Sequence, residues 1–145
     1  HLSVPPEENR MTPTTAPLVD AIDHLVLTVH SIPRSIAFYE RVLGMVAKEF
    51  KPGRHALHFG RQKINLHEVG NVVDPNVKHA TPGSADVCFL TRMPLAEFIA
   101  HLQREQVAIV QGPVRATGAQ AVLQSVYFYD PDENLIEVSN AVDLG

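Results

Sequence analysis

Hydrophobic and polar residues follow one another in a pattern that predicts the same structural unit twice. Residues 23–29 alternate as in a half-buried strand, where successive side chains point to opposite faces. His24, Val26 and Thr28 fall on one face, and Leu25, Leu27 and Val29 fall on the other. The aliphatic face can be covered by a helix, so His24 is expected on the uncovered face.

A helix is predicted directly after this strand. Ser31 is a suitable N-cap, Pro33 is tolerated in the first turn, and Gly44 suits a left-handed C-terminal stop. The apolar residues between them recur at helical spacing, at Ile32, Ile36, Tyr39 and Leu43. Three short strands are then predicted over residues 46–50, 55–59 and 63–69.

The same order returns after a loop rich in turn residues. A strand is predicted over residues 85–90 and a helix from Pro94 onward. Strands then follow over residues 109–112, 125–129 and 135–140, with a Gly/Ala-rich loop at 115–121. Each half reads βαβββ. We therefore predict an α+β protein with two tandem modules, residues 21–70 and 82–140, that form a curved mixed sheet around a cleft.

Residues 1–20 are rich in Pro, Thr and Glu and show no periodicity. We expect a flexible leader there, with Met11 as the natural start and residues 1–10 added during cloning.

Composition narrows the class of protein. A hydrophobic content of 45% and a charged content of 19% are ordinary for a globular protein. The net charge of -4 and the scattered basic residues argue against nucleic acid as a partner. The single cysteine, Cys88, excludes an internal disulfide and fits a reducing, cytoplasmic setting. Cys88 lies in an apolar run, so we expect its side chain to be buried as a small hydrophobic group. No apolar stretch is long enough to span a bilayer.

Strand alternation also identifies polar residues on the uncovered faces. His24 in the first module corresponds to Asp86 in the second, and Asn65 corresponds to Glu137. A carboxylate in an apolar cleft is costly unless it is paired, protonated or bound to a metal. His24, Asp86 and Glu137 therefore predict a mixed nitrogen and oxygen site for one divalent ion. Two alternatives stay open: a hydrogen-bonded core histidine, and ion pairs of the carboxylates with Lys63 or an arginine.

The segments IDHLVLTVHSIPRSIAFYERVLG and SVYFYDPDENLIEVSN resemble the opening and closing motifs of the vicinal-oxygen-chelate superfamily. This superfamily includes glyoxalase I, fosfomycin-resistance proteins, extradiol dioxygenases and bleomycin-resistance proteins. The resemblance covers about residues 20–142. INLHEVG and GPVRATGAQ make the chain most similar to the branch of glyoxalase domain-containing protein 5 and bacterial lactoylglutathione-lyase-like proteins. The resemblance to the superfamily implies that His24 and Glu137 are metal ligands.

The chain departs from the superfamily at two positions. Enzymes of the superfamily usually have His where this chain has Asp86, and glyoxalase I has Glu where it has Asn65. Asp can still bind a hard cation through oxygen, whereas an amide is a poorer ligand. We expect Asn65 to bind substrate and His67, two residues further along the same face, to act in acid–base catalysis together with Glu137. In the loop at 115–121, Arg115 and Thr117 could meet an anionic substrate.

Two functions follow from this resemblance. The first is a divalent-metal-dependent lyase, isomerase or transferase that uses Mn, Ni, Zn or Fe on a small oxygen-chelating substrate, such as a thiol adduct. The second is a metal-free protein that sequesters a ligand, as bleomycin-resistance members do. For either function we expect a homodimer with a small-molecule ligand and no nucleic-acid or membrane partner.

Overall fold

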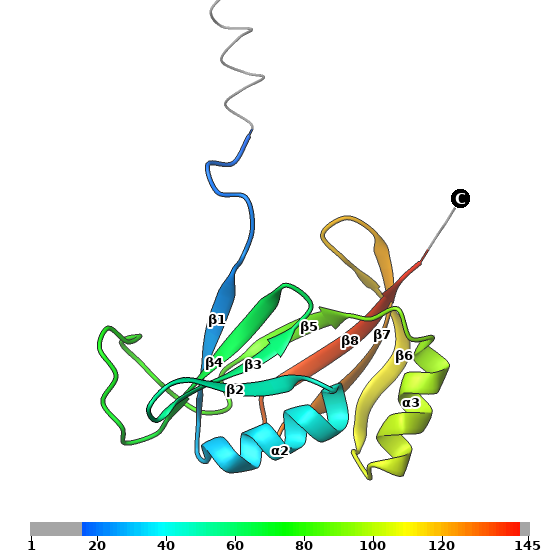
Figure 1. The fold of residues 1–145 in the computed structure, drawn as a ribbon. Coiled ribbons are helices and arrows are strands. Elements are labelled where there is room, and N and C mark those ends of the chain that lie inside the picture. The colour runs from blue at the N-terminus through cyan, green and yellow to red at the C-terminus, as the bar shows by residue number, and fades with distance from the viewer. Residues whose placement is uncertain (1–15, 143–145) are drawn as a thin grey trace, which may run out of the picture.

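The computed structural model describes residues 16–142 and confirms the predicted order of elements (Figure 1). The first module contains β1 (His24–Val29), α2 (Ile32–Leu43), β2 (Val46–Lys51), β3 (Arg54–Phe59) and β4 (Gln62–Glu68). The second contains β5 (Asp86–Leu90), α3 (Leu95–Arg104), β6 (Ile109–Thr117), β7 (Val122–Tyr129) and β8 (Leu135–Ala141). Each module is therefore βαβββ.

The strands form two separate four-stranded sheets, in the orders β1-β4-β3-β2 and β5-β8-β7-β6. In each sheet the first and last strands of the module pair in parallel, and the other pairs are antiparallel. The parallel pairs have the same register, beginning at His24 with Lys63 and at Asp86 with Leu135. His24 is therefore equivalent to Asp86, and Asn65 is equivalent to Glu137.

The residues predicted to begin and end α2 have these roles in the structure. The Oγ atom of Ser31 accepts a hydrogen bond from the backbone N–H of Arg34 at 3.2 Å. Pro33 lies in the first turn, and Gly44 adopts the left-handed conformation with φ 67°. This helix covers one face of its sheet with the buried side chains of Ile32, Ser35, Phe38, Tyr39 and Val42.

The covered faces of both sheets share one hydrophobic core. Phe38 on α2 contacts Phe128 on β7, with ring centroids 6.4 Å apart. The Tyr39 hydroxyl donates to the carboxylate of Asp130 at 2.6 Å, just after β7. Since the modules meet through their helix-covered faces, the two uncovered sheet faces lie outside this core. Figure 1 shows α2 below the strands of the first sheet and α3 beside β6.

The predicted loop at 115–121 is shorter than expected. Ladder pairing of Thr117 with Val122 extends both β6 and β7, and only residues 118–121 remain as the turn. Gly118 is required there, because a Cβ atom would lie 2.7 Å from the carbonyl oxygen of Ala121.

Most of the predicted leader, including Met11, lies outside the described residues. Within residues 16–142, neither helix combines the length and apolar character needed to cross a membrane.

Candidate functional site

A pocket of about 630 Å³ lies on the uncovered face of the second sheet. Its floor includes Cys88 and Glu137 from neighbouring strands, and the turn at 118–121 forms one wall. Most of the remaining lining is apolar or small, at Leu90, Thr117, Leu123 and Ala141. A pocket of this size can take a small organic molecule, and Glu137 is the ionisable group best placed to orient it.

Glu137 is held in place by two serines. The Oγ atom of Ser125 donates to Glu137 Oε2 at 2.6 Å, and the Oγ atom of Ser139 lies 3.3 Å from the same oxygen. The two serine hydroxyls are also 2.6 Å apart, and both residues are fully buried. Because these bonds all involve Oε2, the other carboxylate oxygen remains available to a ligand.

Two further groups share the surroundings of this carboxylate. Although the residue is exposed, partial desolvation of its sulfur raises the pKa of the Cys88 thiol; a hydrogen bond with Ser139 lowers this pKa, and the charge of Glu137 raises it. Burial also raises the pKa of Tyr127, and Glu137 adds to that effect. The charge of Asp86 acts on both groups in the same direction. The second sheet therefore presents an anionic surface with a protonated thiol and a protonated phenol at neutral pH.

The first sheet carries the other predicted ligand. The side chain of His24 is 43% exposed, and its Nδ1 atom lies 2.9 Å from Oδ2 of Asp23. A carboxylate at Nδ1 fixes the tautomer that leaves Nε2 free to bind a metal. This exposure contradicts the alternative in which His24 is a core residue.

One chain does not bring the predicted ligands together. Among the described residues, no group of three or more His, Cys, Asp or Glu side chains is close enough to hold a metal ion. His24 therefore does not join Asp86 and Glu137 within a single chain. The ion-pair alternative is also absent from the described part of the chain, where neither carboxylate pairs with a basic side chain.

Asn65 and His67 are buried, with exposed fractions of 7% and 5%. The Oδ1 atom of Asn65 has no hydrogen-bond partner, whereas Nδ1 of His67 lies 3.3 Å from Oδ1 of Asn76. Asn76 belongs to the connection between the modules, so the long connection contacts this face of the first sheet. The predicted roles of Asn65 in substrate binding and of His67 in proton transfer stay predictions.

The remaining predicted residues differ in their positions. Thr117 lines the pocket beside Glu137. Arg115 pairs with Gln124, on the opposite face of the sheet from Ser125, and is not part of the pocket lining. Cys88 is exposed, so the expectation of a buried residue was wrong. The apolar run around it belongs to a strand with only one covered face.

Sequence reasoning missed Ser125 and Tyr127. Both are cross-strand neighbours of the β8 site residues, Ser125 of Ser139 and Tyr127 of Glu137. Their signal is polar residues at alternate positions in a predicted strand, but the partner of each depends on the register between β7 and β8.

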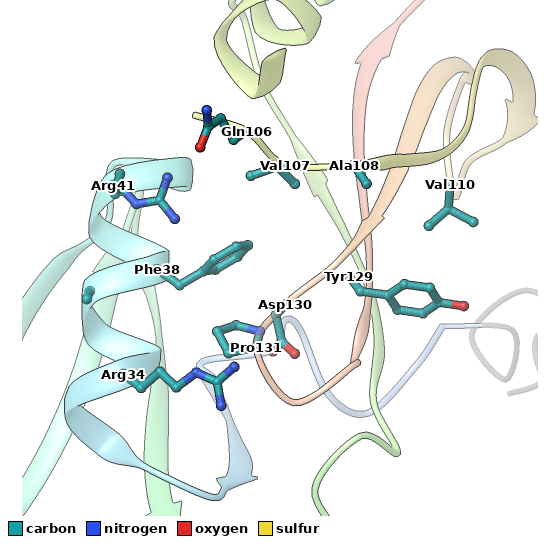
Figure 2. Close-up of a pocket in the computed structure, with 11 residues that line it drawn as sticks. Arg34, Phe38, Arg41, Gln106, Val107, Ala108, Val110, Tyr129, Asp130 and Pro131 are labelled. Atoms are coloured by element: carbon teal, nitrogen blue, oxygen red, sulfur yellow. The ribbon is translucent and has the colours of Figure 1, made fainter. Parts of the chain in front are cut away.

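A second hollow, of about 470 Å³, lies between α2 and the segment after α3. Figure 2 shows Phe38 and Arg41 projecting from α2 into this hollow, and Arg34 of the same helix beside Pro131. Arg41 is already bound there by Glu105, whose carboxylate lies 2.9 Å away. The hollow contains none of the predicted site residues, so the pocket at Glu137 remains the candidate site.

Comparison with known proteins gives a consistent assignment. A family model described as Glyoxalase/Bleomycin resistance protein/Dioxygenase superfamily matches residues 21–138. The chain is 49% identical over 125 residues to virulence protein STM3117 of Salmonella typhimurium, covering 86% of this chain and 87% of that protein. The crystal structure of that protein superposes with a TM-score of 0.85 over 86% of this chain and 99% of the other.

The chain is also 46% identical over 125 residues to glyoxalase domain-containing protein RDO1 of Mycosarcoma maydis, covering 86% of this chain and 70% of that protein. More distant structures share the fold alone. They include a lactoylglutathione lyase from Agrobacterium tumefaciens, with 21% identity, TM-score 0.65 and coverage of 86% and 96%. An antibiotic binding protein from Streptomyces, TnmS3, has 18% identity, TM-score 0.67 and coverage of 88% and 100%.

Proposed function

Because the chain belongs to the Glyoxalase/Bleomycin resistance protein/Dioxygenase superfamily, we propose that it is a metal-dependent enzyme whose site is completed by a second copy of the chain. The match confirms the superfamily that the opening and closing motifs resemble. The observation that carries the proposal is the anchoring of Glu137 by two buried serines in a pocket, on the same sheet face that carries Asp86 outside the pocket lining.

The donor groups fit a divalent ion. Within residues 16–142 no hydrogen bond occupies Glu137 Oε1, the Asp86 carboxylate or His24 Nε2. Two carboxylate oxygens and one imidazole nitrogen suit Mn, Ni, Zn or Fe. A site built from His24 of one chain with Asp86 and Glu137 of another would explain why one chain alone lacks a three-donor group.

Charge complementarity supports a homodimer in which unlike sheets face each other. The uncovered face of the first sheet carries Lys63 and its register partner His58. Lys48 lies on the same face, two residues along β2 from Val46, which is the other partner of His58. The uncovered face of the second sheet carries Asp86 and Glu137 and no lysine or arginine. Apolar residues on these faces are also exposed, including Val26 at 39%, Phe50 at 39% and Leu90 at 69%. Burial of such surface favours association.

A bound divalent ion would supply Lewis acidity toward two adjacent oxygens of the substrate. The residues of the chain have separate tasks. Ser125 and Ser139 orient Glu137 by holding Oε2, and Leu90 and Leu123 exclude water from the pocket. Proton transfer falls to Glu137 or to His67, and a positioned acid or base typically contributes about 10²- to 10⁴-fold.

The reaction class proposed is that of a lyase, isomerase or transferase acting on a small substrate with adjacent oxygens, such as a thiol adduct of a carbonyl compound. A lactoylglutathione lyase with the same fold supports this choice at the level of architecture.

A metal-free binding protein is the second candidate. The lack of a three-donor group among the described residues of one chain favours it, as does the apolar lining of the 630 Å³ pocket. An antibiotic binding protein with the same fold supports a binding role at the level of architecture.

Metal analysis separates the two candidates. Purified wild-type protein is expected to retain divalent metal, and Mn²⁺, Ni²⁺ or Zn²⁺ should raise its melting temperature, because a ligand that binds only the folded state stabilises it. Glu137→Ala should weaken metal binding by about 100-fold or more. Loss of a residue that only hydrogen-bonds to a metal ligand already weakens binding by up to about 100-fold, and loss of the ligand itself should cost at least as much. Glu40→Ala, an exposed change on α2, is the matched control. Wild-type protein that neither retains nor responds to metal would refute the enzyme proposal.

A further inference from the structure

Two cationic side chains converge on one aromatic ring on the uncovered face of the first sheet. The Cζ atom of Arg54 lies 5.2 Å from the centroid of Phe50, and the Nζ atom of Lys63 lies 4.3 Å from the same centroid. The three residues come from β3, β2 and β4, so the arrangement depends on the sheet and not on one flexible segment. Phe50 is 39% exposed, and its ring is therefore within reach of a ligand.

Neither cation is neutralised by a carboxylate. The ion pairs formed within residues 16–142 join His24 to Asp23, His30 to Asp132, Arg41 to Glu105 and His55 to Glu49. The Nε atom of Arg54 is buried without a hydrogen-bond partner. A buried donor on a charged group that lacks an acceptor is costly, and within residues 16–142 no carboxylate offsets the charge of this guanidinium.

Two imidazoles lie beside Lys63. Both register neighbours of Lys63 are histidines, His24 on β1 and His58 on β3. Arg54 and Lys63 share one ring, and their charges lie within about 10 Å, close to the Debye length at 0.1 M salt. They repel each other, and each contact with the ring offsets only part of that cost. An anion bound beside this ring would be attracted to both charges.

We propose that Arg54 and Lys63, with Phe50, form a binding site for an anionic group, a carboxylate, phosphonate or phosphate, of the small molecule that enters the cleft. The guanidinium can hold two oxygens of such a group, and the ammonium adds a point charge. The exposed ring of Phe50 would contact the apolar part of the same molecule. This inference rests on the proposed function in one respect, that the uncovered face of the first sheet forms part of the substrate site. It adds that the substrate is anionic.

Inorganic phosphate is a suitable probe, and calorimetry on the full chain is a suitable measurement. The protein should be stripped of metal with a chelating resin, because EDTA itself carries carboxylates that would compete. At constant ionic strength, phosphate is expected to bind the wild type. Arg54→Met and Lys63→Met should each weaken binding by about tenfold or more, since each removes a charge-assisted contact. Arg54→Lys should retain part of the affinity.

Arg34→Met is the matched control. It removes the same charge from the separate hollow beside α2 and should leave phosphate binding unchanged. The proposal is overturned if phosphate does not bind the wild type, if it binds all variants equally, or if only Arg34→Met abolishes binding. Light scattering would also measure the oligomeric state of each variant. If the Arg54 and Lys63 variants become monomers while their phosphate affinity is unchanged, the cations pair with a second copy and the proposal is wrong.

The outcome is separable from that for the proposed function. If the wild-type protein binds metal but does not bind phosphate, the anion site is refuted and the metal-dependent enzyme is not. Intact phosphate binding in a protein that takes no metal would refute the metal-dependent enzyme instead.

Discussion

The two modules share one backbone plan and differ in what they place on their uncovered faces. Glu137 and Asn65 are equivalent by register, yet Glu137 Oε2 contacts two serine hydroxyls while Asn65 Oδ1 has no partner. The second face is acidic and encloses a pocket, and the first is basic and carries the exposed imidazole of His24. The duplicated unit therefore carries two unlike faces, which we propose are the two halves of one site.

The contact that fixes the two modules back to back should show the largest effect on stability. Tyr39→Phe removes the 2.6 Å hydrogen bond to Asp130, whose carboxylate also accepts from the side chain and backbone of Asn134. Burial and the Asp130 charge raise the pKa of Tyr39, so the hydroxyl is a donor at all ordinary pH. We expect a loss of about 2–3 kcal/mol in the free energy of unfolding, measured in urea.

Tyr129→Phe removes an equivalent hydroxyl from a half-exposed position and should cost little. Equal losses for the two variants would show that the buried pair does not hold the modules together.

The contrast between Glu137 and Asn65 can be measured as a pair of substitutions. Ser125→Ala removes a 2.6 Å bond to a carboxylate and should cost about 1–2 kcal/mol. Asn65→Leu replaces an amide whose buried oxygen lacks a partner, so stability should change by less than about 1 kcal/mol or increase. Chemical denaturation of both variants provides the comparison. A larger loss for Asn65→Leu than for Ser125→Ala would contradict the described difference between the two faces.

The acidic character of the second face should appear in the titration of Cys88. Its pKa is raised from the usual 9.0 by partial desolvation of the sulfur and by Glu137. The protonated thiol therefore contributes stability below pH 9 that is lost as the pH rises through the raised value. The rate of alkylation by iodoacetamide should therefore reach its midpoint above pH 9.0. Glu137→Gln should move the midpoint down toward that value. A midpoint below the usual value would mean that cations, not carboxylates, surround the thiol.

Local patterns in the sequence were sufficient to predict the elements and the faces. The caps of α2 at Ser31 and Gly44 depend on neighbouring residues only, and strand alternation depends on a period of two. For that reason His24 and Glu137 could be placed on uncovered faces without knowledge of the fold. The boundaries of β6 and β7 were less predictable, because pairing between two strands extended both into a segment that reads as a loop.

Contacts between distant residues could not be predicted. The bond from Ser125 to Glu137 requires the register of β7 with β8, and the bond from Tyr39 to Asp130 joins residues 91 positions apart. The burial of His67 depends on the connection that contains Asn76. The packing of the two modules decides whether His24 can reach Asp86 and Glu137. Strand alternation in the sequence does not report how the modules pack.

The central claim, that one site is built from unlike sheets of two chains, can be tested by mixing two inactive variants. His24→Ala and Glu137→Ala should each, when alone, bind metal about 100-fold or more weakly than the wild type and retain none on purification. Unfolding and refolding them together at equal concentrations should produce mixed dimers with one intact site and recover about a quarter of the wild-type metal content, as random pairing in a symmetric dimer requires. Recovery near that level is the predicted result. No recovery from a mixture that forms mixed dimers, alongside a wild type that binds metal, would contradict the account.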